Sequence, residues 1–408
     1  MKRVAVVGAG LMGLGIAQVV AAAGLDVVLV GRDGAAACAG RERLAVQLAR
    51  QVSRSRLTAA QAEAWMARVQ AADGDADLAA CDLAIESVPE DRELKLAVLQ
   101  RLQAALPAGT LIATNTSGLP IGGLASALRR PERFVGLHFF SPVERMPLVE
   151  VVRGPATASA SLREALAFVV AIGQRPIVVR DGPGFFTSRV FAAYLDEALA
   201  MVGEGIDPAS IEQAGVALGR PIGPLAVIDE VSLLLNLQQA RQARRDGLEL
   251  RFCRSLAEPV LARMVGQGRG GRRDGGGFHD HEATGRSLWP GLAQVFALAA
   301  QQPSLDVVSR RLRCAEVLEA LRCLEQGVIT SADDADTGSL LGLGFPPASG
   351  GVLRWAETEG LGRLVDDCAA LARDHGWRFE PSPWLRTLAG AGQGLAAWRQ
   401  HRLTGDTE

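Results

Sequence analysis

Short apolar runs alternate with longer amphipathic segments over the first 182 residues of the chain. Helix-like segments separate the apolar runs, two of them ending before residues 108 and 173. Repeated strand and helix units predict a doubly wound, mainly parallel α/β sheet over residues 1–182, with ligands at the carboxyl ends of its strands. The strand candidates lie at residues 4–7, 27–30, 82–90, 111–118, 133–140, 148–154 and 175–181.

Residues 35–75 lack this alternation and are predicted to form helices inserted after the second strand. We expect the later helix to begin at Thr58, because a threonine hydroxyl can accept a hydrogen bond from the first turn.

The turn after the first strand carries the pattern Gly8-x-Gly10-x-x-Gly13. Gly8 allows a tight turn, Gly10 lets the backbone approach a pyrophosphate, and Gly13 lets a helix pack on the strand. The helix N-terminus offers free N–H groups to the phosphates. Strand patterns on both sides of the motif favour a Rossmann-type dinucleotide-binding domain over an ordinary glycine-rich turn.

After residue 182 the pattern becomes helical and repeats itself. Residues 188–206 align with residues 310–328, each containing Glu-Ala-Leu and then a matching glycine. Residues 218–230 align with residues 343–357 around a shared Gly-x-Pro. The sheet domain is therefore expected to be followed by two copies of one all-α module.

The two all-α modules are predicted over residues 183–300 and 301–408. Between the repeated segments lies a polar, glycine-dense joint, residues 266–287, which has the composition of a flexible loop. His279 and His281 lie in this joint, but two imidazoles are too few for a metal site and we assign no metal.

Composition narrows the class of function. The 408 residues are 48% hydrophobic and 22% charged, with a formal charge of −2, as in a soluble globular protein. Such a charge favours a small-molecule substrate over nucleic acid or an anionic membrane. No apolar run is long enough to span a membrane, and we expect no targeting segment. The six cysteines form no CxxC pair, which fits the reducing cytoplasm.

Seven motifs together resemble the (S)-3-hydroxyacyl-CoA dehydrogenases. The likeness spans nearly the whole chain and is greatest to the dehydrogenase half of the large bifunctional enoyl-CoA hydratase/3-hydroxyacyl-CoA dehydrogenase chains, without the hydratase half. It implies interconversion of (S)-3-hydroxyacyl-CoA and 3-oxoacyl-CoA by hydride transfer to a nicotinamide cofactor, as in fatty-acid β-oxidation. The motifs are residues 8–13, 84–95, 113–121, 136–151, 180–189, 271–278 and 344–351.

The motif at residues 136–151 contains the candidate catalytic pair. Oxidation of a secondary alcohol needs a base that takes the hydroxyl proton while hydride leaves the same carbon, and neutral imidazole has suitable basicity. His138 matches the family's catalytic base, and Glu150 matches the carboxylate that orients it. Taken alone, His138 would more simply be a hydrogen-bonded core histidine beside an unrelated glutamate.

Two serines complete the candidate catalytic set. Ser117 stands at a strand end and matches the serine that contacts substrate and cofactor, although capping a turn or helix is an alternative use of serine. Ser188 stands where most of the family has asparagine. Its hydroxyl can still donate to a thioester carbonyl, with fewer donors than an amide.

The resemblance also implies a set of cofactor contacts. Glu90 and Lys95 match cofactor-contacting positions, and Lys95 is one of only two lysines in a chain rich in arginine. Arg273 takes the place of the family's usual lysine in the joint. The other predicted cofactor-binding residues are Gly8, Gly10, Leu11, Met12, Gly13, Arg32, Ser117 and Ser141.

The end of the second strand leaves the choice of cofactor open. An NAD-binding domain should have an acidic residue near Gly31 to accept hydrogen bonds from the adenine ribose. Gly31 and Arg32 would instead favour the 2′-phosphate of NADP, unless Asp33 takes the acidic role. The family resemblance favours NAD and the local residues favour NADP.

Other functions and the assembly also remain open. The chain could oxidise a free 3-hydroxy acid rather than a thioester, or act as a non-catalytic nucleotide-binding partner of a separate enoyl-CoA hydratase. The duplicated module speaks against the first alternative and the intact catalytic set against the second. We expect a monomer, because the second helical module can cover the apolar face through which single-module relatives dimerise.

Overall fold

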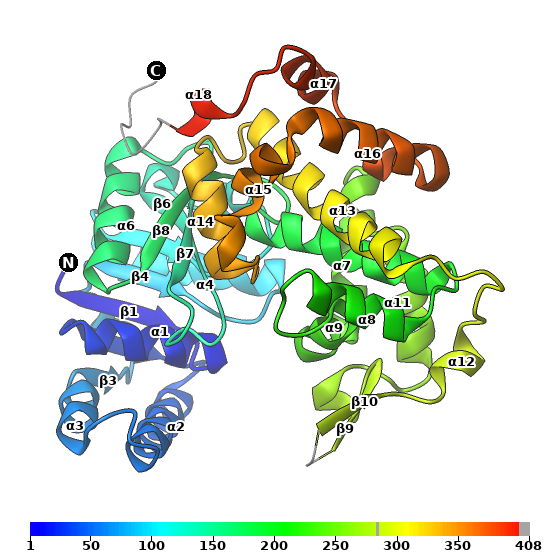
Figure 1. Ribbon diagram of the computed structural model, residues 1–408. Helices are drawn as coiled ribbons and strands as arrows, with labels where there is room; N and C mark the ends of the chain where they lie inside the picture. Colours follow the sequence, from blue (N-terminus) through cyan, green and yellow to red (C-terminus); the bar gives the residue numbers. More distant parts are fainter. Residues whose placement is uncertain (283–284, 400–408) are drawn as a thin grey trace. The chain divides into compact units, whose positions relative to one another are not determined.

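The computed structural model describes residues 1–282 and 285–399, which form two compact units (Figure 1). The sheet unit contains residues 1–186 and 327–342, and the helical unit contains residues 187–326 and the described residues from Leu343 onward. The first segment of the sheet unit thus ends at Phe186, close to the predicted boundary at residue 182. The unit also includes residues 327–342, which were predicted to belong to the second helical module. The predicted division of the helices at residue 300 stays a prediction.

The predicted doubly wound sheet is confirmed. Eight strands lie in the order β3-β2-β1-β4-β5-β6-β7-β8. Neighbouring strands are parallel except for β6 and β7, which run antiparallel. Only β3 was not expected, since its three residues lie in the stretch predicted to be helical. The strands are β1 (Arg3–Val7), β2 (Asp26–Val30), β3 (Val69–Ala71), β4 (Leu83–Glu86), β5 (Leu111–Thr114), β6 (Phe134–Phe139), β7 (Leu148–Arg153) and β8 (Arg175–Arg180).

Helices cover the sheet and complete its core, in which the valine-rich strands are almost fully buried. Thr58 caps α3 as predicted, in a reciprocal capping box with Gln61. Helix α14 packs against β7 and β8 (Figure 1), and Arg180 N–H donates to the Val328 carbonyl just before this helix. The helices are α1 (Leu11–Ala22), α2 (Gly34–Ser53), α3 (Ala59–Ala67), α4 (Arg92–Ala105), α5 (Ile121–Ala125), α6 (Ser159–Ala171) and α14 (Ala332–Gly342).

In the helical unit, α7 and α13 pack side by side around a shared apolar core. The repeat is visible in the backbone, because both helices are followed by a left-handed glycine, Gly205 at φ 82° and Gly327 at φ 67°. The larger helices are α7 (Thr187–Gly203), α8 (Pro208–Ala217), α9 (Pro224–Val231), α10 (Leu233–Arg245), α11 (Ala257–Gly266), α13 (Leu305–Glu325), α15 (Val352–Glu359), α16 (Leu361–His375) and α17 (Pro383–Gly390), and the short ones are α12 (Leu292–Val295) and α18 (Ala396–Arg399).

The glycine-dense joint contains paired strands where the structure describes it, so the expectation of a loop without regular structure is wrong, whereas its flexibility stays a prediction. It forms an antiparallel hairpin of β9 (His279–Glu282) and β10 (Gly285–Leu288). The buried Asp229 carboxylate, on α9, accepts the backbone N–H groups of Phe278 and His279 at 2.7 and 2.8 Å. A contact so distant in sequence leaves no trace in the local composition that suggested a loop.

Candidate active site

The register of β6 and β7 places His138 directly opposite Glu150. Side chains opposite one another on adjacent strands lie on the same face of a sheet, so the antiparallel pairing brings the two together. His138 Nδ1 lies 2.7 Å from Glu150 Oε2, and Glu150 is fully buried. An ionised carboxylate can only accept, which assigns the Nδ1 proton to this contact.

The surroundings of the pair leave one imidazole nitrogen available. The His138 ring is buried, with 7% of the residue exposed, and Nε2 makes no hydrogen bond within the described part of the chain. Phe140 packs against the ring at a centroid distance of 4.4 Å, and Phe185 lies 6.3 Å away. The Phe186 N–H donates to Glu150 Oε1 at 3.2 Å. His138 is thus held in one tautomer, with Nε2 as the free acceptor.

Ser117 lies just beyond the carboxyl end of β5, in a turn fixed from two sides. Its backbone N–H donates to Glu90 Oε1 at 3.2 Å, and the Thr116 hydroxyl donates to the same oxygen. Asp181 accepts the N–H groups of Ile121 and Gly122, at 2.8 and 2.7 Å, at the start of the short helix that follows. The turn carrying Ser117 is therefore anchored to both β4 and β8.

Three residues of this arrangement were not singled out in the sequence. Asn115 accepts the Phe139 N–H at 2.8 Å and donates to Ser87, which ties the end of β6 to β5 and β4. Asp181 and Glu86 anchor neighbouring turns. All three lie at or just beyond strand ends inside the seven motifs that resemble the family, so their position in the sequence could have identified them as candidate site residues.

The glycine-rich turn has the geometry that a dinucleotide phosphate requires. A Cβ at Gly8, where φ is 119°, would lie 2.3 Å from the Ser87 carbonyl oxygen, and one at Gly13 would lie 1.8 Å from the Gly8 oxygen. At Gly10, by contrast, nothing lies within 4 Å of a Cβ position. No side chain caps α1, so the N–H groups at Leu11 and Met12 remain for a ligand. These residues fit the pyrophosphate of a dinucleotide.

At the end of β2, Gly31 occupies the position where an NAD-binding domain usually has a carboxylate for the adenine ribose. A Cβ at Gly31 would lie 2.5 Å from the Ala37 backbone nitrogen, so no acidic side chain fits there without a backbone shift. Asp33 caps α2 by accepting the Ala36 N–H at 2.7 Å. The Arg32 side chain is 89% exposed and lies 3.3 Å from Asp33.

The other predicted site residues differ in their surroundings. Ser141 is exposed and follows β6 closely, on the same unit as His138. Ser188, half-buried in the first turn of α7, and the exposed Arg273 belong to the helical unit. Their roles stay predictions. Lys95 is buried, with 1% exposed, and pairs with Glu86 and Glu90.

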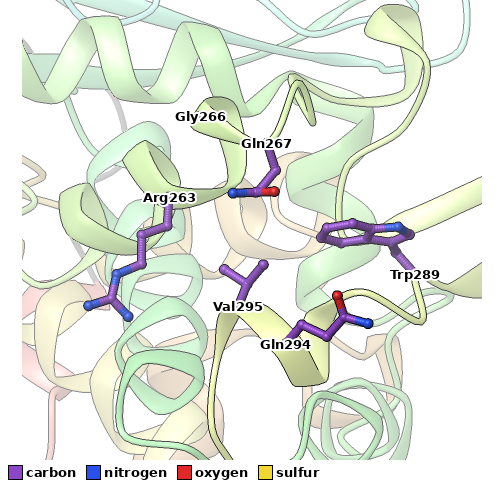
Figure 2. Close-up of a pocket in the computed structure, with 6 residues that line it drawn as sticks. All are labelled: Arg263, Gly266, Gln267, Trp289, Gln294 and Val295. Carbon is purple, nitrogen blue, oxygen red and sulfur yellow. The ribbon is translucent and has the colours of Figure 1, made fainter.

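Two surface hollows lie away from these residues. One of about 840 Å³ adjoins the amino ends of β4, β5 and β6, opposite the edge where parallel sheets bind ligands. The other, about 570 Å³, lies in the helical unit (Figure 2), and its residues include exposed Arg263 and Gln294 but no buried charged group. Neither contains a predicted site residue, so we define the site by the strand ends.

Within residues 1–282 and 285–399, no cluster of three or more His, Cys, Asp or Glu side chains is suited to a metal ion. Over the same ranges, none of the helices has the length and apolar content that a membrane crossing requires.

Known proteins resemble this chain in sequence over both units. Residues 3–182 match the 3-hydroxyacyl-CoA dehydrogenase NAD-binding domain, and residues 184–281 match the C-terminal domain of the same enzymes. The fatty acid oxidation complex subunit alpha of a Shewanella species (strain ANA-3) is 33% identical over 95% of this chain and 55% of its own length. The chain therefore spans about half the length of the curated relatives it matches.

Solved structures extend the likeness to the fold. The 3-hydroxybutyryl-CoA dehydrogenase of Escherichia coli K12 superimposes with a TM-score of 0.81 at 27% identity, covering 96% of this chain and 98% of that chain. The (S)-3-hydroxybutyryl-CoA dehydrogenase PaaH1 of Ralstonia eutropha is 35% identical, with a TM-score of 0.63, over 68% of this chain and 98% of its own. The chain belongs to the 3-hydroxyacyl-CoA dehydrogenase family.

Proposed function

We propose that the protein is an NAD-dependent dehydrogenase that interconverts (S)-3-hydroxyacyl-CoA and 3-oxoacyl-CoA. The observation that carries this proposal is the buried His138–Glu150 pair, held by strand register with Nε2 free. Support comes from the family and from the relatives' names, which specify 3-hydroxybutyryl-CoA in two solved structures.

In the proposed reaction, His138 acts on the substrate hydroxyl. Its Nε2 accepts the hydroxyl proton during oxidation and returns it during reduction. Glu150 stabilises the resulting imidazolium without moving a proton itself. The phenylalanines around the pair exclude water, which strengthens this interaction. A nicotinamide cofactor held by the glycine-rich turn and the α1 N-terminus would supply the hydride acceptor for the same carbon.

The remaining predicted residues bind and orient. Ser117 is proposed to hydrogen-bond to the substrate oxygen, and Ser188 to the thioester carbonyl. The glycine-rich turn and the α1 N-terminus would hold the pyrophosphate. Glu90, Ser141 and Arg273 are proposed to line the rest of the cofactor site.

A direct assay tests the reaction. The full chain is mixed with acetoacetyl-CoA and NADH, and the loss of nicotinamide absorbance is followed. We expect turnover with the thioester and little or none with free acetoacetate. Turnover of acetoacetate alone would identify a dehydrogenase of free 3-hydroxy acids, and NADH binding without turnover of either would indicate a non-catalytic protein.

We further propose that NADP is accepted beside NAD. Support comes from the missing ribose acceptor at Gly31 and from the exposed Arg32 side chain. Loss of a charge-assisted hydrogen bond costs about 1.5–3 kcal/mol, so discrimination against NADP should be weak. Arg32→Ala should weaken NADPH binding and spare NADH. A parent enzyme that prefers NADH by about a thousandfold, roughly 4 kcal/mol, would contradict this proposal.

We also propose a monomer. In the repeat alignment, Arg311 takes the place of Arg189 and Glu319 that of Glu197. Arg189 Nε donates to Glu319, and Arg311 Nε donates to Glu197 at 2.7 Å, so two equivalent ion pairs join α7 and α13 reciprocally. Reciprocal contacts of this kind are typical of a twofold dimer interface, here formed within one chain.

Sedimentation tests the assembly. The full chain should sediment as one species of 42.9 kDa. Ending the chain at Ala300 removes α13, so that fragment should dimerise or aggregate. A stable dimer of the full chain, or a well-behaved monomeric fragment, would contradict the proposal.

Two further proposals concern the location of the protein, which is the cytoplasm, and its association with a separate enoyl-CoA hydratase. All six cysteines are free thiols, which supports a reducing compartment. The hydratase proposal is supported by the matched relatives, which are subunits of a fatty acid oxidation complex. Capture with the tagged chain, followed by a hydratase assay, tests it.

A further inference from the structure

Lys95, on α4, is surrounded by acceptors of its own chain. Its ammonium lies 2.9 and 3.2 Å from the two oxygens of Glu86, 3.3 Å from the Val88 carbonyl oxygen and 3.3 Å from Glu90 Oε2. An ammonium has three N–H donors, and here the two Glu86 oxygens and the Val88 carbonyl accept them, while Glu90 adds an ion pair. With 1% of the residue exposed, Lys95 has no donor left for a cofactor.

Glu86 is the buried partner in the network formed by Lys95, Glu86, Glu90 and the turn that carries Ser117. It is fully buried at the end of β4, and it also accepts the Val88 N–H at 2.7 Å and the Thr114 hydroxyl at 2.5 Å. A buried carboxylate without a cation is costly, so Lys95 is the counter-ion that permits Glu86 at this position.

Glu90 lies between Lys95 and the turn that carries Ser117. Its side chain is 23% exposed, one oxygen lies near Lys95, and the other accepts the Ser117 N–H at 3.2 Å and the Thr116 hydroxyl. Thr116 in turn accepts the Leu119 N–H at 3.0 Å. An ion pair between Lys95 and Glu90, followed by hydrogen bonds from Thr116 and Ser117 to Glu90, therefore connects the buried ammonium to the turn that carries Ser117.

We propose that Lys95 is a positioning residue, which fixes the Ser117 turn through Glu90 instead of contacting the cofactor as the resemblance implies. This inference rests on the proposed dehydrogenase function, in which Ser117 touches the substrate. Displacement of a substrate-positioning group by about 1 Å can cost about 100-fold in rate, so loss of the network should act on turnover.

The first test is Lys95→Met, with the exposed Lys2→Met as the matched control, since these are the only two lysines. We expect kcat with acetoacetyl-CoA to fall about 10- to 100-fold while the NADH dissociation constant, followed by nicotinamide fluorescence, changes less than about threefold. Lys2→Met should alter neither. A tenfold or greater rise in the NADH dissociation constant with unchanged kcat would show that Lys95 contacts the cofactor and would overturn the proposal.

The second test separates positioning from simple loss of stability. Lys95→Met leaves Glu86 buried without its cation, whereas the double variant Lys95→Met/Glu86→Gln removes that charge as well. The double variant should recover melting temperature but keep the low kcat, because Glu90 still lacks its partner. Recovery of kcat to the parent value would overturn the proposal.

Thr116→Val gives an independent test that leaves the buried charges intact. It removes the hydroxyl that donates to Glu90 and accepts the Leu119 N–H but leaves the Ser117 N–H bond to Glu90, so we expect a smaller fall in kcat, again with NADH binding unchanged. Parent-like kcat in this variant would overturn the proposal even if both Lys95 variants failed to fold. If the parent does not turn over acetoacetyl-CoA, the proposed function fails, and the NADH titrations still decide whether Lys95 contacts the cofactor.

Discussion

A buried histidine is paired with a carboxylate in each of the two units. In the sheet unit, His138 Nδ1 lies 2.7 Å from Glu150, and in the helical unit, His279 Nδ1 lies 2.8 Å from Asp229. Both residues are almost enclosed, 7% and 4% exposed. Burial and a carboxylate partner therefore do not by themselves distinguish a base from a structural contact.

The difference lies at the second ring nitrogen. Nε2 of His138 has no protein partner among the described residues, whereas Nε2 of His279 lies 3.5 Å from Glu212. Burial alone would lower the pKa of His279, but the hydrogen bonds to Asp229 and Glu212 outweigh it and raise the pKa to about 9. At neutral pH His279 is thus a cation with both N–H groups committed, and it cannot accept a proton.

The largest expected effect comes from truncating each histidine in turn. His138→Ala should lower kcat by about 10²- to 10⁴-fold, with NADH binding near that of the parent, because the base is lost while the cofactor's phosphates are held elsewhere. His279→Ala should keep most of the activity per folded molecule and lower the melting temperature, because Asp229 and Glu212 lose their cation. Steady-state rates and thermal unfolding of both variants provide the measurements. Equal activity of His138→Ala and the parent would eliminate His138 as the base.

Local sequence predicted the first pair and missed the second for a physical reason. His138 and Glu150 lie on consecutive strands, and both belong to one recognisable motif. Their pairing still depended on the β6–β7 register, which no residue pattern specifies. Asp229 and His279 meet across a long sequence separation, and the polar, glycine-rich composition around His279 suggested a flexible loop.

A similar limit applies to the site itself. The rarity of lysine drew attention to Lys95, but its burial depends on Glu86 and Glu90, which β4 and the turn after it bring together. Likewise, the sequence showed an acid missing at Gly31, whereas the close backbone of α2 that excludes one appears only in three dimensions. The sequence thus drew attention to Lys95 and Gly31, but it did not show which groups surround either residue.

Removing the carboxylate charge should have a smaller effect than removing the base. Glu150→Gln should lower kcat by roughly 10- to 1000-fold, because an amide can donate to Nδ1 and select the wrong tautomer. Asp229→Asn is the matched change in the other unit and should keep kcat per folded molecule near that of the parent. Steady-state rates of the two variants provide the measurement. A comparable fall of kcat in Asp229→Asn would mean that the two pairs are not functionally distinct.

The smallest expected effect is a dependence of stability on pH that belongs to His279 alone. Its pKa is raised in the folded protein, to about 9 from an ordinary value near 6.5. A raised pKa gives a contribution that is complete below about pH 6.5 and is lost as the pH rises through about 9. The parent should therefore lose up to about 3 kcal/mol of unfolding free energy over this window from His279, a loss that His279→Gln does not show.

Urea unfolding at intervals between about pH 6 and pH 10 would measure the unfolding free energy of both proteins. Subtracting the values of the variant removes the contribution of other titrating groups. Identical pH dependence in the two proteins would show that His279 is not a buried cation, and the contrast with His138 would then rest on the position of Glu212 alone.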